Sequence, residues 1–167
     1  MNRSSIFTLS AITALGLMVL PSSIAAQGTL RQQLVGTWMI VSYELTVANG
    51  TKQQPYGADP AGILILDAGG RYAVMEGKRD RPKLKSANRS EITAQEFGAA
   101  ALDFAANYGT WSVNEADKTL SRKVEGALNP NNVGNEVKST VSLTGDELKL
   151  TNTNPAGVRG QLYRRAR

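Results

Sequence analysis

Residues 34–44 constrain the fold of this chain more than any other stretch. Their sequence is LVGTWMIVSYE, in which a glycine and a large indole open a run rich in β-branched and aromatic residues. This composition predicts a first strand over residues 37–47. Gly36 has no Cβ, so a ring or a backbone can cross close above it, and Trp38 is large enough to plug the closed end of a small barrel.

The rest of the chain contains further strand-length apolar segments separated by turn-forming residues. With the first strand they make eight antiparallel strands, preceded by a helical turn over residues 29–34. Short connections between consecutive strands favour an all-β up-and-down barrel, because closure removes exposed strand edges. The other seven predicted strands cover residues 63–66, 71–75, 108–113, 119–126, 136–143, 148–152 and 158–165.

One helix is expected between the third and the fourth predicted strands. Thr93 and Glu96 have the spacing of a capping box at the start of an alanine-rich segment. The helix is predicted from residue 95 to about residue 106, with Phe97 and Phe104 on one apolar stripe. That stripe either packs on the outside of the barrel, the reading we favour, or covers its mouth.

Residues 1–26 have the pattern of a secretory signal peptide. Arg3 precedes an apolar run that is short for a bilayer span, and the segment ends in small residues with cleavage after Ala25 or after Ala26. Residues 27–167 are then expected to form one exported barrel domain, periplasmic or secreted, with no transmembrane segment in the mature protein.

The chain contains no cysteine and no histidine. Disulfides, thiolate nucleophiles, imidazole bases and nearly all zinc-site geometries are therefore excluded, and no calcium-loop motif is present. No metal or cofactor is expected. The basic run over residues 78–85 includes an aspartate and a proline but no aromatic residue, so it predicts a solvated loop, with an anionic ligand or membrane surface as the alternative. No nucleic-acid partner is expected, and the protein is predicted to be a monomer.

Several motifs together resemble the bacterial lipocalin-like domain family of the calycin and lipocalin superfamily. They are LVGTWMIVSYE, PYG at 55–57, GILIL at 62–66, AGGRYAV at 68–74, YGTWSV at 108–113 and VEG at 124–126. The resemblance implies an eight-stranded barrel that holds a small, mostly apolar molecule. It also implies that Arg165 in the last strand packs across Trp38, so Gly36, Trp38 and Arg165 are expected to close the barrel. It supplies no catalytic residues.

The first strand presents a conflict between its two faces. Strict alternation from Trp38 places Ser42 and Glu44 on the same face as the indole, although the opposite face is more apolar. Either the lumen is partly polar, or a β-bulge shifts the register and exchanges the two faces of the strand. We favour a polar lumen, since a ligand cavity needs a few polar groups among apolar walls.

The candidate ligand-binding residues combine charged and aromatic side chains. Arg122 makes its segment more cationic than the family pattern, and Tyr72 and Tyr108 offer aromatic rings with hydroxyl groups. For Glu125, we expect a surface cross-strand pair in preference to an internal ion pair. The full set is Ser42, Glu44, Tyr72, Tyr108, Arg122 and Glu125.

The sequence leads to an exported protein that binds a small hydrophobic or amphipathic molecule without converting it. The alternative is a metal-free isomerase or cyclase in which a desolvated Glu44 or Glu125 acts as general acid or base. A third reading is a protein without a ligand that acts through its surface loops. A lumen filled by side chains would favour a protein without a ligand. An empty lumen with one polar end would favour the binding protein, and a well-placed desolvated glutamate would favour the enzyme.

Overall fold

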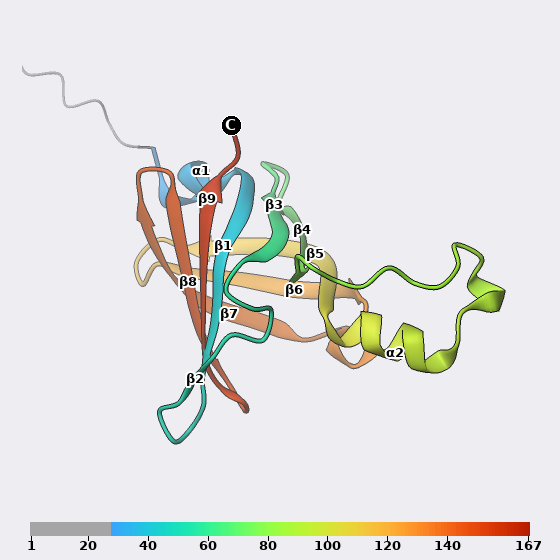
Figure 1. Cartoon of the computed structure of the whole chain (residues 1–167). Coiled ribbons are helices and arrows are strands. Elements are labelled where there is room, and N and C mark those ends of the chain that lie inside the picture. The colour runs from blue at the N-terminus through green and yellow to red at the C-terminus, as the bar shows by residue number, and fades with distance from the viewer. Residues whose placement is uncertain (1–27) are drawn as a thin grey trace, which may run out of the picture.

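The chain forms a closed antiparallel barrel, described for residues 28–167 of a computed structural model (Figure 1). The predicted signal peptide and its cleavage site lie outside these residues. The helices are α1 (Leu30–Leu34) and α2 (Ala94–Leu102), with 3₁₀ turns η1 (Arg89–Glu91) and η2 (Pro130–Asn132). The strands are β1 (Gly36–Thr46), β2 (Lys52–Gln53), β3 (Pro60–Leu66), β4 (Arg71–Lys78), β5 (Phe104–Asn114), β6 (Thr119–Ala127), β7 (Glu136–Thr144), β8 (Glu147–Asn154) and β9 (Gly157–Arg165).

Eight of these strands close the barrel in sequence order, and β1 pairs with β9 to complete the ring. Strand β2 pairs only with the end of β1 and lies outside the ring. The predicted closed barrel is therefore confirmed. The predicted place of the helix is wrong by strand number, because the loop after β1 contributes this extra strand and α2 follows β4.

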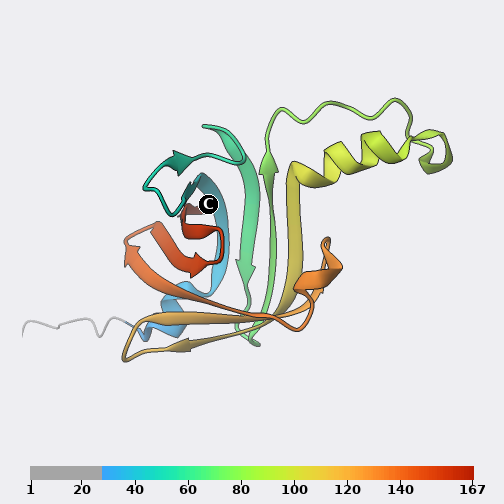
Figure 2. The same cartoon turned by 90° about the horizontal axis from the view of Figure 1, so that it is seen from below.

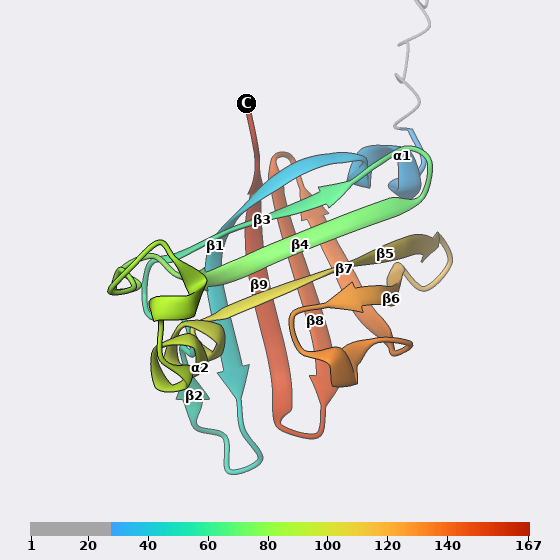
Figure 3. The ribbon, with the colours of Figure 1, turned by 90° about the vertical axis from the view of Figure 1, so that its right-hand side faces the viewer.

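The barrel folds into two crossing halves. In Figures 1 and 3, β1, β8 and β9 run nearly upright while β5 and β6 run across them. Strand β7 joins the halves, because residues 136–140 pair with β6 and residues 140–144 pair with β8. This change of partner bends the sheet around an interior space.

A β-bulge in β1 resolves the conflict that the sequence posed. The register with β9 shifts between Ile40 and Ser42, so Tyr43 packs against the core and Val41 is left 37% exposed on the outside. A bulge places one extra residue opposite its partner strand and thereby exchanges the two faces. The bulge reading is the one that the structure shows.

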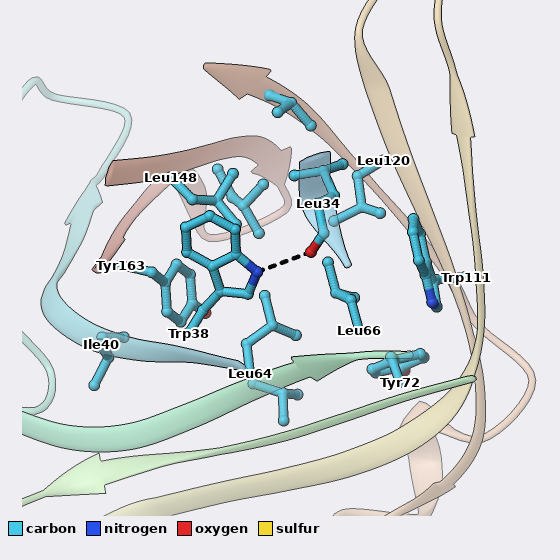
Figure 4. Close-up of a cluster of buried hydrophobic side chains, with 13 residues drawn as sticks. Leu34, Trp38, Ile40, Leu64, Leu66, Tyr72, Trp111, Leu120, Leu148 and Tyr163 are labelled. Carbon is cyan, nitrogen blue, oxygen red and sulfur yellow. Dashed lines mark hydrogen bonds between the residues drawn. The ribbon is translucent and has the colours of Figure 1, made fainter. Parts of the chain in front are cut away.

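Helix α1 closes one end of the barrel above Trp38. The indole Nε1 donates to Leu34 O at 2.9 Å, as the dashed line in Figure 4 shows, and both residues are fully buried. The first turn of α1 is held from across the barrel, because Leu30 N and Arg31 N each donate to the Glu115 carboxylate at 2.9 Å. Helix N-termini leave such N–H groups without partners, so this carboxylate satisfies two of them.

Arg165 fixes the same closure from the other side of the indole. Its guanidinium carbon lies 4.1 Å from the Trp38 ring centroid, Nη1 donates to Val35 O at 3.0 Å and Nη2 donates to Gln33 O at 2.6 Å. Gly36 makes room for this group: its φ is +141°, and an added Cβ would lie 2.7 Å from Arg165 Nη1. Cation–π contact and two charge-assisted hydrogen bonds thus tie β9 to the segment that enters β1.

The core fills the α1 end of the barrel with large apolar side chains. Figure 4 shows them pointing inward from strands all around the ring. Its buried members are Leu34, Trp38, Ile40, Leu64, Leu66, Tyr72, Val74, Trp111, Leu120, Val141, Leu148, Leu150 and Tyr163.

Helix α2 projects away from the barrel instead of packing on it (Figures 1 and 2). The Thr93 capping box with Glu96 is present as predicted, but no residue of the helix is buried. The helix also ends at Leu102 rather than near residue 106, because residues 104–106 pair with β4 as the start of β5. The expected packing of its apolar stripe on the outside of the barrel is therefore wrong.

Removing the Arg165 guanidinium is expected to destabilise the closure. Arg165→Met keeps much of the aliphatic stem but loses the cation–π contact and the bonds to two carbonyl groups, so the free energy of unfolding should fall by about 2–4 kcal/mol. Urea unfolding followed by tryptophan fluorescence measures this change.

Arg164→Met is the matched control, one residue earlier in β9. Its guanidinium pairs with Glu147 at 3.1 Å on the surface, where both side chains are more than half exposed. Such a pair contributes about 0–1 kcal/mol. Equal losses in the two variants would contradict the role assigned to Arg165.

Candidate functional site

A polar cavity of about 130 Å³ occupies the barrel interior at the end opposite α1. The side chains around it come from strands on both halves of the barrel and from two loops. Its walls are formed by Tyr43, Tyr56, Val74, Glu76, Ala105, Asn107, Arg122, Asn132, Arg159 and Gln161.

Glu76 is a carboxylate buried in the wall of this cavity. It is 4% exposed, and both of its oxygens accept from Gln161 Nε2, at 2.8 and 2.9 Å. Tyr163 Oη donates to Glu76 Oε1 from the core side. Desolvation raises the pKa of Glu76, against the hydrogen bond from Tyr163 and the field of Arg122, both of which lower it.

Two arginines face the same cavity from opposite strands. Arg122 on β6 is only 5% exposed, and its guanidinium carbon lies 5.6 Å from the Tyr72 ring centroid. Arg159 on β9 lies at the same distance from the Tyr43 ring. The buried Nε of each has no hydrogen-bond partner among residues 28–167, and neither guanidinium forms an ion pair there.

Tyrosine hydroxyl groups surround these charges as neutral donors. Tyr43 and Tyr56 pack with ring centroids 4.8 Å apart, and burial raises the pKa of Tyr56 to about 12. Tyr72 Oη donates to Asn107 Oδ1 at 2.8 Å, and burial likewise raises the pKa of Tyr72. Phenols with raised pKa values keep their protons near neutral pH, so they can donate hydrogen bonds to an acceptor.

An apolar groove of about 600 Å³ adjoins the polar cavity on the outside. It lies between α2, the start of β5 and η2, and shares the wall residues Ala105, Asn107 and Asn132 with the cavity. Leu102 and Leu128 line it and are 85% and 50% exposed. The polar cavity and the apolar groove therefore share one short section of the barrel wall.

A comparison with protein-family models decides the relationship of this chain to known proteins. Residues 35–162, most of the chain, match the lipocalin-like domain. The chain belongs to the lipocalin-like domain family. A comparison with curated proteins finds no match.

Solved structures similar to this lipocalin-like protein are small barrels at low sequence identity. A redesigned β-barrel is 13% identical with a TM-score of 0.43, and the alignment covers 82% of this chain and 95% of that one. Fatty-acid-binding protein 1 of Echinococcus granulosus is 15% identical with a TM-score of 0.40, covering 81% of this chain and 99% of that one.

The lipocalin-like barrel brings together only two of the six predicted ligand-binding residues. Tyr72 and Arg122 are buried, and they lie against each other at the cavity end of the core. Both stand on the inward side of strands that the sequence predicted, β4 and β6.

Ser42 and Glu44 do not face the lumen as expected. The bulge after Ile40 turns both outward, opposite Leu162 and Gly160 of β9. Glu44 pairs on the surface with Lys52 of β2 at 3.4 Å. The expectation of a desolvated Glu44 in the lumen is therefore wrong.

Tyr108 and Glu125 also lie on the outside of the barrel. Tyr108 is 54% exposed, and its ring covers Gly126 so closely that an added Cβ there would clash with it. Glu125 forms a bidentate surface ion pair with Arg71, at 2.7 and 3.0 Å. The favoured surface pair for Glu125 is thus what the structure shows, and a lumenal Glu125 is ruled out.

Sequence reasoning missed the buried carboxylate and most of its surroundings. Glu76 continues the alternation of Tyr72 and Val74 along β4, and Arg159 and Gln161 continue that of Tyr163 along β9. Extending the inward parity of each strand to its end would have found them. The described residues contain no group of three or more carboxylates placed to hold a metal ion.

The buried carboxyl should give the stability of the protein a distinctive pH dependence. Because the pKa of Glu76 is raised above 4.5, the native state holds this proton to a higher pH than the unfolded chain does. Its contribution to the free energy of unfolding is therefore greatest below the unfolded-state pKa and decreases as pH rises through the folded-state pKa.

Comparison of the wild type with Glu76→Gln isolates this effect. The difference in free energy of unfolding, wild type minus variant, is expected to decrease from about pH 4 to about pH 8 in urea titrations. An equal denaturant slope for the two proteins shows that they unfold in the same transition. A difference that rises with pH would contradict the raised pKa.

Proposed function

We propose that this lipocalin-like protein is an exported binding protein for a small amphipathic molecule, which it holds without converting it. The observation that carries the proposal is the polar cavity whose wall is shared with an apolar groove. One end of a ligand would lie among the cavity's donors, and its apolar remainder would cover Leu102 and Leu128.

The size of each space supports this division. Ligand pockets usually have volumes of about 300–1,000 Å³. The inner cavity, at about 130 Å³, has room for a polar group alone, whereas the groove of about 600 Å³ can take a ring system or a short chain. Side chains fill the rest of the barrel toward α1, which leaves no space there for a long apolar ligand.

The leader pattern of residues 1–26 supports export to the periplasm or beyond the cell. Among residues 28–167, no helix is both long and apolar enough to cross a bilayer. We propose that the monomer is the binding unit.

A second candidate function rests on Glu76 itself. A buried carboxyl with a raised pKa, beside a cavity that can admit a substrate group, is suited to general acid or base catalysis. The reaction would be a metal-free isomerisation or cyclisation of a small metabolite. In that case Glu76→Gln should abolish conversion of the bound molecule and leave its binding intact.

Native mass spectrometry of the protein purified from its own host tests the binding function. A retained small molecule, identified after denaturation, is the expected result. Ala105→Phe should reduce its occupancy by about tenfold or more, because the added ring enters the shared wall of cavity and groove.

Ser112→Phe is the matched control. Ser112 lies on the same strand but is exposed on the outside and lines neither space. Occupancy in this variant should equal that of the wild type. Equal occupancy in both variants would show that the ligand binds elsewhere on the protein. A chemically altered molecule released only by the wild type would favour the enzymatic function.

A further inference from the structure

The polar cavity contains more positive than negative charge. Two guanidinium groups, those of Arg122 and Arg159, face it, and Glu76 is the only carboxylate that residues 28–167 contribute to its wall. Gln161 and Tyr163 engage the Glu76 oxygens by hydrogen bonds, and neither arginine forms an ion pair with them. A buried cation is costly unless it is paired and hydrogen-bonded.

We propose that the polar end of the ligand is an oxyanion, bound between Arg122 and Arg159. This inference rests on the proposed binding function and specifies the chemical class of its ligand. A carboxylate, sulfonate or phosphate supplies the acceptor oxygens that these guanidinium groups lack, and arginine is well suited to such planar, forked contacts.

The surrounding side chains hold the two arginines ready for such a group. Each guanidinium lies over a tyrosine ring, Arg122 over Tyr72 and Arg159 over Tyr43. The buried Nε of each arginine has no hydrogen-bond partner among the described residues, and both side chains line the cavity. Binding sites prepared in this way lose less entropy when the ligand arrives.

The apolar groove sets the rest of the ligand's chemistry. Its walls include Ala101, Leu102 and Phe104 on one side and Leu128 on the other. Since it meets the cavity at Asn107 and Asn132, a molecule with an acidic head and a compact apolar body can contact both. Neutral lipids lack the acidic head, and neutral sugars lack both features.

A pair of fluorescent probes tests the charge requirement. Anilinonaphthalene sulfonate carries one anionic group on an apolar ring system, and N-phenylnaphthylamine has the same rings without the sulfonate. The wild type is expected to bind the sulfonate about tenfold or more tightly than the neutral probe, because only the sulfonate can use the charged donors.

Variants of the two arginines locate the effect. Arg122→Gln and Arg159→Gln should each weaken sulfonate binding by about tenfold to a hundredfold and change the affinity for the neutral probe by less than about threefold. Arg71→Gln removes a guanidinium from the outer surface, where it pairs with Glu125, and should affect neither probe.

Glu76→Gln gives a result of opposite sign and keeps the test informative should an arginine variant fail to fold. At a pH above the folded-state pKa of Glu76, removing this carboxylate from the cavity wall lowers the repulsion of an incoming anion, so the sulfonate probe should bind more tightly than to the wild type. Unchanged or weaker sulfonate binding by this variant would contradict an anion site beside Glu76.

Competition with bound anilinonaphthalene sulfonate tests whether the site prefers a carboxylate or a phosphate. Decanoate and decyl phosphate have equal chains with different heads, and decanol is the neutral control. Stronger displacement by either anion than by decanol supports the proposal and identifies a carboxylate or a phosphate as the preferred head. Equal displacement by all three would overturn it.

The outcomes distinguish this inference from the function on which it rests. Equal binding of both probes, unaffected by the arginine variants, would overturn the oxyanion site and leave the binding function standing. Binding of neither probe, with no molecule retained by the protein from its host, would overturn both.

Discussion

The fold depends on the closure of β1 against β9 around Trp38. The indole is fixed at its Nε1 by the Leu34 carbonyl and over its ring by Arg165, which also binds the carbonyls of Gln33 and Val35. With this contact in place the first and last strands complete the ring, and no long strand edge of the barrel remains unpaired. From β3 to β9, each strand pairs with the next strand in the sequence.

A single bulge divides the interior into two environments. Before it, Trp38 and Ile40 point into a packed apolar core, and after it Tyr43 points toward the cavity with Arg159 and Gln161 opposite. Polar groups in an apolar barrel are costly unless they are paired. Here Glu76 accepts hydrogen bonds from Gln161 and Tyr163, while the buried Nε atoms of Arg122 and Arg159 have no partner among the described residues.

The sequence was informative wherever local signals acted alone. Strand and turn residues predicted the barrel, and the Thr93 capping box predicted the start of α2. Long-range pairing decided the rest. Residues 104–106 continue a helical pattern, yet they pair with β4, and the two-residue strand β2 has no apolar pattern to reveal it. The bulge in β1 depends on its register with β9, so Ser42 and Glu44 were assigned to the wrong face.

Helix α2 is stabilised by far less burial and pairing than the strands of the barrel. The helix has nine residues, none of them buried, and a helix this short is only marginally stable in water. Its unfolding breaks none of the strand pairs that close the ring, since β5 begins after it. The groove beside the cavity is therefore bounded by a segment that can unfold locally while the ring of strands stays closed, which under the proposed function offers a route for the exchange of a bulky ligand.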